Sequence, residues 1–269
     1  MVFKGFFEKI VSKLHTIGVF MYLSNVQVAL VFDLDDKIIF TLGERLKEAQ
    51  KKYAANLQLL NVPNGAPNEA PRLLFMTQSF NVNISLNRAD IFINVPEHIK
   101  TNISECLNYS YTVVNNIYAL LFMNFVKYNW CGIILNLCFP SGKQPSLKAL
   151  EKIAPYVIKI NSNGREMASF NLQIGFKEPP YFKNITINGY EQFQLKIPTP
   201  QEQIYQQIIF NDAEVVEAGI SIILDVNNIP QINKNSFEND FNDIIKKIES
   251  SYLSLFDELN ITGSIINVE

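Results

Sequence analysis

The stretch RLLFMTQSFNVNISLNRADIFINVP, residues 72–96, contains the clearest secondary-structure pattern in the chain. Apolar side chains in residues 80–86 alternate with Asn and Ser, which is typical of a strand with one buried face. Asn87-Arg88 suits a turn, and residues 90–95 can pair back on the first strand. We therefore predict an antiparallel meander, which a purely parallel α/β sheet would not contain.

Helical and strand patterns extend from this meander in both directions. Apolar side chains recur at helical spacing in residues 41–59, 97–127 and 236–258. Apolar strands are predicted within residues 19–33, 130–139, 165–197 and 218–228. Short elements are also expected, namely helices over residues 3–15 and 146–158 and a strand in residues 261–269.

The order of these elements predicts an α+β protein in which antiparallel meander sheets pack against long helices. Each half of the chain runs through a strand, a helix, a meander and a long aromatic helix, so the two halves are similar in outline. We divide the chain into an N-terminal α+β half, residues 1–128, and a C-terminal α+β half, residues 129–269. These halves pack closely together or form a single domain.

The composition describes a folded protein of low charge. Of the 269 residues, 48% are hydrophobic and only 18% are charged, and the formal net charge is −3. A nucleic-acid-binding protein usually carries a basic excess, so this balance gives no general reason to expect one. The odd number of cysteines, three, favours free thiols in a reducing cytoplasm.

The most apolar long stretch, residues 17–32, is interrupted by Ser24, Asn25 and Gln27. It is shorter than the ~20 apolar residues that a membrane-spanning helix needs. We therefore expect a cytoplasmic protein that does not use a membrane as its partner.

LVFDLDDKII, residues 30–39, ends an apolar run with closely spaced aspartates. Asp33 and Asp35 resemble the Asp-x-Asp of haloacid dehalogenase phosphatases, in which one carboxylate attacks phosphorus and Mg²⁺ neutralises charge. Asp225 is the candidate for a third metal ligand. Asp36 and Lys37, however, replace the small residue and the hydroxyl of that motif. We interpret the aspartates as a solvated turn and keep a Mg²⁺-dependent phosphohydrolase as the alternative.

A second charged stretch, RLKEAQKK, lies within the predicted helix of residues 41–59. Its basic side chains are Arg45, Lys47, Lys51 and Lys52. Together with neighbouring glutamates they are typical of a solvated helix face with ion pairs along the helix. The same side chains are the candidate binding residues of this chain, because a helix of this kind can also contact the phosphates of RNA.

The remaining motifs predict no cofactor. Neither His15 nor His98 lies at a metal-ligand spacing, and Cys106 lies about two helical turns from His98 on the same predicted helix. PSGKQPS, residues 140–146, lacks both the upstream glycine and the Mg²⁺-binding hydroxyl of a phosphate loop. We expect neither a resident metal nor an organic cofactor.

The last third of the chain resembles the end of a sporadically distributed, uncharacterised bacterial protein family. An apolar strand ending in Leu224-Asp225 is followed by a helix and then by Phe256 and Ile261-Thr262. WCGIILNL and FNVNISLNRADI also fit the outline of that family. The resemblance implies a similar α+β fold and an association with mobile elements, and it carries over no catalytic residue.

Taken together, these patterns predict a non-catalytic cytoplasmic binding protein that docks on a protein or a ribonucleoprotein complex. A phage or mobile-element inhibitor of a bacterial defence system, of the anti-CRISPR type, belongs to this class. The many Asn, Gln, Tyr and Phe residues suit adaptable contact surfaces. The alternatives are the phosphohydrolase with Asp33 and Asp35, and an RNA-binding protein that uses the basic helix.

Overall fold

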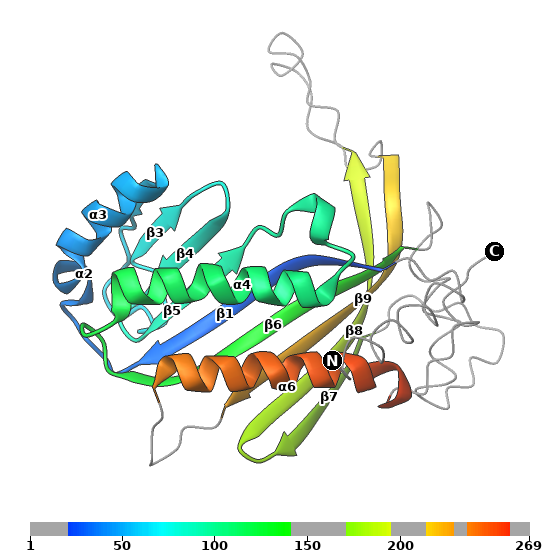
Figure 1. Cartoon of the computed structure of the whole chain (residues 1–269). Coiled ribbons are helices and arrows are strands. Elements are labelled where there is room, and N and C mark those ends of the chain that lie inside the picture. The colour runs from blue at the N-terminus through cyan, green and yellow to red at the C-terminus, as the bar shows by residue number, and fades with distance from the viewer. Residues whose placement is uncertain (1–20, 141–170, 195–213, 229–235, 259–269) are drawn as a thin grey trace, which may run out of the picture.

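The computed structural model describes residues 21–140, 171–194, 214–228 and 236–258, which form one large sheet with helices on one of its faces (Figure 1). Two helices, α4 (Ile103–Ile117) and α6 (Phe237–Glu258), lie side by side along that face. Two shorter helices, α2 (Ile38–Thr41) and α3 (Gly43–Tyr53), lie at one end of the molecule.

The sheet has nine strands in the order β2-β3-β4-β5-β1-β6-β9-β8-β7, and every neighbouring pair is antiparallel. The central strand of the sheet is β1 (Tyr22–Phe32). The first wing consists of β2 (Asn56–Leu59), β3 (Leu73–Met76), β4 (Phe80–Ile84) and β5 (Arg88–Ile93). The strands of the second wing are β6 (Tyr128–Pro140), β7 (Asn171–Glu178), β8 (Tyr181–Gln194) and β9 (Glu214–Asn228). The predicted meander over residues 72–96 is present as β3, β4 and β5.

The predicted fold class, with several meander sheets packed against long helices in two similar halves, is wrong. The described residues form one continuous antiparallel sheet, and strand rather than helix dominates them. β1 joins the wings because it pairs with β5 on one side and with β6 on the other. These partners lie far from β1 in sequence, and local periodicity carries no signal for such pairing. The boundary drawn between residues 128 and 129 falls at the start of β6.

Two of the predicted helices are also shorter than expected. The helix predicted over residues 97–127 divides into a 3₁₀ turn (Glu97–Ile99), α4 and a π-helical turn (Tyr118–Phe122). The helix predicted over residues 41–59 ends at Tyr53, because residues 56–59 pair with β3 as the edge strand β2. The helix predicted over residues 236–258 is observed as α6. The elements predicted over residues 3–15, 146–158 and 261–269 lie outside the described residues.

The core lies between the helices and the sheet. Alternate strand residues such as Val28, Leu135 and Leu224 are fully buried and point toward α4 and α6. The two helices meet through stacked rings, with Tyr111 and Phe241 centroids 5.8 Å apart. Closer to the start of α6, the Tyr118 and Phe237 centroids are 4.0 Å apart. This aromatic seam fixes the two helices beside each other on the sheet.

Polar contacts hold α6 to the second wing at two places. Near its start, Asp240 Oδ2 accepts hydrogen bonds from Tyr128 Oη at 3.0 Å and from Asn228 Nδ2 at 3.2 Å. Further along, the Lys247 ammonium contacts Glu178 of β7, which also accepts from Lys183 Nζ of β8 at 3.0 Å. α6 is therefore tied both to the middle of the sheet and to the β7–β8 hairpin.

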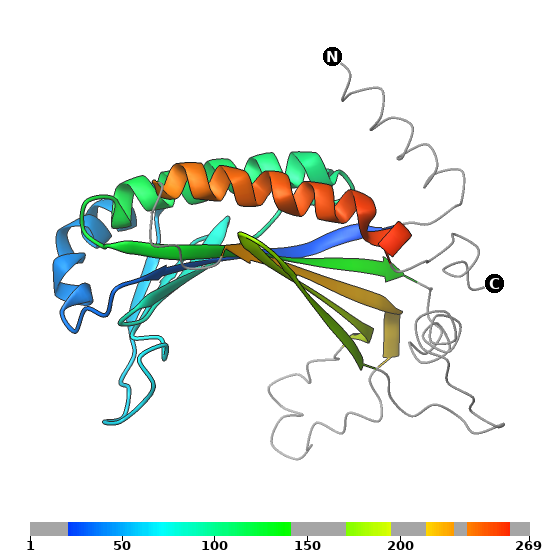
Figure 2. The same ribbon diagram turned by 90° about the horizontal axis from the view of Figure 1, so that it is seen from below.

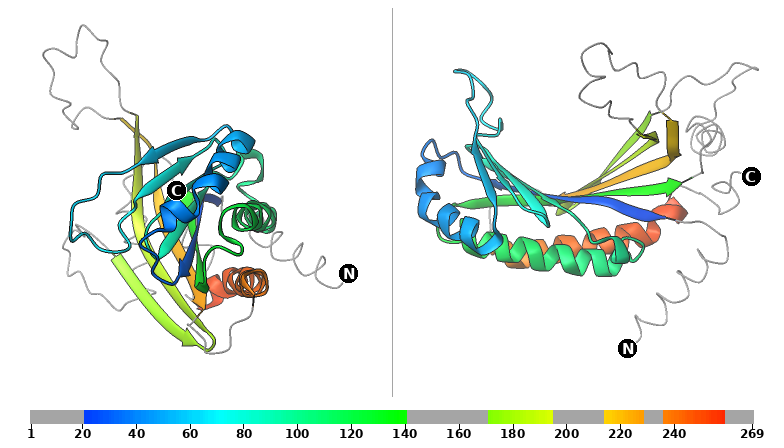
Figure 3. Two further views of the ribbon diagram at one scale, coloured as in Figure 1. Left: turned by 90° about the vertical axis from the view of Figure 1, so that its left-hand side faces the viewer. Right: turned by 90° about the horizontal axis from the view of Figure 1, so that it is seen from above.

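The sheet curves away from the helices, so its other face is the concave one (Figures 2 and 3). Within the described ranges no helix covers that concave face. None of the helices in those ranges is both long enough and apolar enough to cross a membrane.

Candidate binding surfaces

The two aspartates that follow β1 make different contacts. Lys127 Nζ lies 2.9 Å from Asp33 Oδ2, and Asn129 Nδ2 donates to Asp33 Oδ1 at 2.8 Å. Asp35 Oδ1 accepts the backbone N–H of Lys37 at 2.8 Å, which is the local bond of an Asx turn. The Asp35 carboxylate thus closes the turn between β1 and α2, whereas the Asp33 carboxylate contacts side chains at the start of β6.

Asp225 lies elsewhere, on the concave face of the sheet. Its carboxylate accepts from Asn184 Nδ2 at 3.1 Å, and its strand neighbours in register are Ile134 of β6 and then Gln27 of β1. Gln27 precedes Asp33 by about six residues, or roughly 20 Å of strand. The structure does not bring Asp225 together with Asp33 and Asp35. Among the described residues no group of three His, Cys, Asp or Glu side chains could hold a metal ion.

The four basic candidates all lie on α3. Lys47 Nζ pairs with Glu44 Oε1 at 2.8 Å, and this contact holds the pKa of the Glu44 carboxyl below its usual value. Arg45 pairs with Glu48 at 3.4 Å, and its guanidinium lies 5.1 Å from the centre of the Phe125 ring. Lys51 and Lys52 occupy the last turn, where positive charge stabilises the carbonyl end of a helix.

The concave face of the sheet is rich in amide and hydroxyl side chains, because every second residue of its strands points there. They come from both wings: Gln27, Asn81, Asn83, Asn136, Gln173, Asn184, Thr186, Asn188, Ser221 and Asn227. We call these ten side chains, together with Ile134, Phe92, Asp225 and the Arg88–Asp90 pair, the amide face.

The strand register arranges the amide face in rows across the sheet. In one row Asn81 is opposite Phe92, which is opposite Gln27, and the row continues to Ile134, Asp225 and Asn184. Neighbours bond across strands, as where Gln27 Nε2 donates to Asp90 Oδ1 at 3.0 Å. Ser221 Oγ likewise donates to Asn136 Oδ1 at 2.6 Å. The ladder therefore presents these polar groups in fixed positions.

The charged side chains of the concave face include the carboxylates of Asp90, Asp225 and Glu217 and the cations of Arg88 and the exposed Lys177. Arg88 forms a bidentate pair with Asp90, with Nη2 to Oδ1 at 2.7 Å. At the far end, Glu217 accepts hydrogen bonds from the hydroxyls of Tyr22 at 2.6 Å and Tyr190 at 2.8 Å. Burial, and then the bond to Glu217, raise the pKa of both phenols, so the two tyrosines stay neutral donors.

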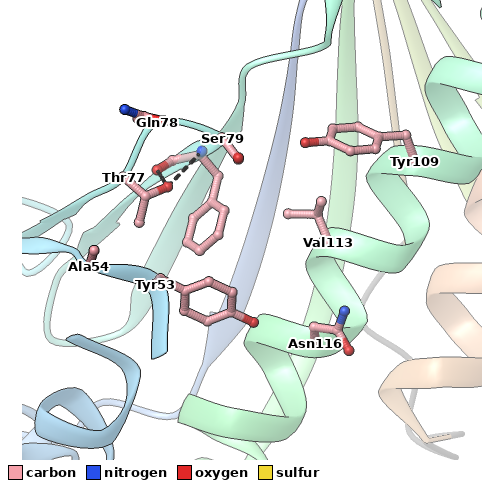
Figure 4. Close-up of a pocket in the computed structure, with 9 residues that line it drawn as sticks. Tyr53, Ala54, Thr77, Gln78, Ser79, Tyr109, Val113 and Asn116 are labelled. Carbon is pink, nitrogen blue, oxygen red and sulfur yellow. Dashed lines mark hydrogen bonds between the residues drawn. The ribbon is translucent and has the colours of Figure 1, made fainter. Parts of the chain in front are cut away.

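A separate pocket of about 380 Å³ lies on the helix side of the sheet (Figure 4). The end of α3, the β3–β4 turn and α4 form its walls. The lining residues are Tyr53, Ala54, Thr77, Gln78, Ser79, Phe80, Tyr109, Val113 and Asn116. The turn is held by Thr77, whose Oγ1 donates to Phe80 O at 2.7 Å and accepts from Phe80 N at 2.9 Å.

Sequence reasoning found part of these surfaces. The alternation in residues 80–86 indicates a polar strand face, and Asn81 and Asn83 lie on the amide face as that pattern implies. The pocket had no such signal, since Tyr53, Phe80 and Tyr109 belong to three separate elements. The chain matches no protein-family model and no curated protein.

Proposed function

We propose that this chain is a non-catalytic binding protein that docks on a protein partner through its amide face. The observation that carries this proposal is an ordered array of amide and hydroxyl groups across both wings of the sheet, on the face that no described helix covers. Such groups offer both donors and acceptors, which suits adaptable hydrogen bonding to another protein surface.

The charge of this face favours a protein over a nucleic acid. A surface that tracks phosphates needs unpaired Lys or Arg side chains. Arg88 is instead held by Asp90, and the carboxylates of Asp225 and Glu217 offset the exposed cation of Lys177. The positive charges proposed for RNA contact lie on α3, which is at the end of the molecule and away from this face.

The geometry gives less support to the phosphohydrolase reading. That chemistry needs Asp33, Asp35 and a third acid around one ion. Asp33 is paired with Lys127, and Asp35 closes a turn. Asp225 lies level with Gln27, roughly 20 Å from Asp33 along the direction of β1. The resemblance of the last third of the chain to a mobile-element family suggests the context of the partner, namely a bacterial defence complex.

The test compares two kinds of variant in a pull-down from host lysate. Asn81→Arg and Thr186→Arg each place a long cation on a different wing of the amide face, and neither side chain bonds within the described residues. We expect the proteins retained by the wild type to fall about tenfold or more with either variant. Circular dichroism melting checks that both variants remain folded.

The matched control is the double change Lys51→Glu and Lys52→Glu on α3. We expect it to retain the same proteins as the wild type, before and after ribonuclease treatment. If the α3 variant loses the partner and the two amide-face variants keep it, docking through the amide face is wrong. Loss of the partner on ribonuclease treatment would instead support the RNA-binding alternative.

A further inference from the structure

The pocket beside the β3–β4 turn has aromatic walls. Phe80 forms its floor and is almost fully buried, and the Tyr53 ring meets it edge-on with centroids 5.1 Å apart. Tyr109 and Val113 project from α4 on the opposite side, and the tyrosines approach the pocket from different elements (Figure 4). A ring that enters this space meets aromatic partners on two sides, which favours an aromatic ligand over a saturated one.

Polar groups converge on the mouth of the same pocket. The hydroxyls of Tyr53, Tyr109 and Ser79 and the amide of Asn116 line it, whereas the Gln78 side chain points away from the cavity (Figure 4). Within the described part of the chain, none of these four lining side chains forms a hydrogen bond, whereas the Thr77 hydroxyl is used inside the turn. A ligand that carries a hydroxyl or an N–H group would therefore find both donors and acceptors at the rim.

The size and charge of the pocket narrow the ligand class. About 380 Å³ is near the lower end of the range for ligand pockets, which suits one ring system. No lining residue carries a charge, so a charged ligand would lose hydration without gaining a partner. We propose that this pocket binds a neutral aromatic ring that bears a hydrogen-bonding group, of the phenol or indole type.

The test is a titration of the full chain followed by the NMR signals of the Val113 methyl groups. The probes are p-cresol and indole, and the matched control is 4-methylcyclohexanol, which has the hydroxyl but not the aromatic ring. We expect both aromatic probes to shift the Val113 signals and to bind roughly three- to tenfold more tightly than the saturated alcohol.

Two variants block the pocket in different ways. Val113→Phe fills it from α4, and Ser79→Tyr narrows its mouth from an exposed turn that does not disturb the core. Binding to the Ser79→Tyr variant is followed by the shifts of the Val113 methyl signals. The Val113→Phe variant lacks these methyl groups, so its binding is followed by saturation transfer to p-cresol. We expect about tenfold or greater weakening with each. The control Asn108→Ala, on an exposed position of the same helix, leaves binding unchanged.

Equal binding of p-cresol and 4-methylcyclohexanol would overturn the proposal. So would p-cresol binding that neither pocket variant weakens. A further probe, N-acetyltyrosinamide, separates the two sources of such a ring. If it binds as well as p-cresol, the pocket accepts a side chain of a protein partner. If only p-cresol binds, the natural ligand is a free small molecule.

Discussion

A single amide side chain at the end of β9 completes several buried bonds. Asn228 Oδ1 accepts the backbone N–H of Cys131 at 2.9 Å, and its Nδ2 donates to Asp240 Oδ2 at 3.2 Å. Tyr128 Oη lies 3.2 Å from the same nitrogen. Asn228 thus serves the backbone of β6 and the first turn of α6 at once. Burial raises the pKa of Tyr128, so its hydroxyl stays a donor to Asp240.

We expect Asn228→Leu to lower the free energy of unfolding by about 2 kcal/mol, because it leaves the buried Cys131 N–H and a carboxylate without this partner. Urea unfolding followed by circular dichroism measures the change. Asn188→Ala, on the amide face of β8, serves as the control and should change stability by less than about 0.5 kcal/mol. Equal losses of stability in the two variants would show that the bonds of Asn228 stabilise the fold no more than the side chain of Asn188 does.

Single residues show how far sequence reasoning reaches. The interpretation of Asp33 and Asp35 as turn residues rests on the side chains that interrupt the phosphatase motif; Asp35 closes a turn, whereas Asp33 bonds to Lys127 and Asn129 at the start of β6. Nothing near Asn228 in sequence indicates its role. Its partners Cys131 and Asp240 come from two other elements, and only the fold brings them together.

Among the elements, α6 and the β7–β8 hairpin share an ion cluster. Lys183 is almost fully buried, and its ammonium lies 3.0 Å from Glu178 and 4.9 Å from the centre of the Phe176 ring. Lys247 of α6 contacts the other oxygen of Glu178. The hydrogen bonds from Lys247 and Lys183 hold the pKa of Glu178 below its usual value of 4.5.

This depressed pKa predicts a pH dependence of stability. A carboxyl whose pKa is lower in the folded state contributes stability above its unfolded pKa, near 4.5, and loses it as the pH falls through the folded pKa. Glu178→Gln should cost about 1–3 kcal/mol at pH 7. Its stability should also fall less than that of the wild type between pH 6 and pH 3.5, as measured by urea midpoints. Parallel pH profiles would contradict this role of Glu178.

The matched change Lys183→Met removes the buried cation and keeps the apolar stem. It should cost less than Glu178→Gln, because replacing a buried ion with an apolar group is often close to neutral. A larger loss from Lys183→Met would place the main stabilisation in other contacts of this lysine.

Helices were predicted well where their sequence signal was complete. α6 begins after Ser236 and has a regular apolar stripe, and its predicted and observed limits agree. The segment after Glu97 has the same periodicity but divides into a 3₁₀ turn, α4 and a π-helical turn. The π-helical turn packs against α3, and α4 packs against β1 and β5; these are tertiary contacts that periodicity does not encode.

The seam between β6 and β9 joins β9, β8 and β7 to the rest of the sheet. The strands come very close at two glycines. A Cβ on Gly219 would lie 2.2 Å from the backbone oxygen of Phe139, and one on Gly132 would lie 2.8 Å from Asn227 Cβ. Glycine at these positions lets the two backbones pair without a side-chain clash.

We expect Gly219→Ala to lower the free energy of unfolding by about 3 kcal/mol, because the clash is with backbone and cannot be relieved by a side-chain rotation. Thermal melting measures the loss. Gly43→Ala, at the start of α3, is the control: nothing lies within 4 Å of its Cβ, so the change should be neutral or stabilising. Melting temperatures of the two variants that match within error would refute the close approach at the seam.

The single sheet is the part of the architecture that the sequence could not reveal. The alternation in residues 80–86 and the apolar runs of β6 and β9 indicate strands, but they do not say which strands are neighbours. A duplication in outline suggested two sheets. The observed register instead places β1 between β5 and β6. This pairing is specified by the burial of apolar side chains on strands that lie far apart in the chain.

The central place of β1 has a consequence for how the protein is made. β1 is the earliest described strand, yet its two partners follow it by about 60 and about 100 residues, a non-local arrangement that slows folding. At ordinary rates of translation an apolar strand with two open edges waits on the order of ten seconds for its second neighbour. A ribosome that pauses before β6 therefore leaves this strand without its second neighbour, and a holding chaperone that covers it in that interval would raise the yield of native protein.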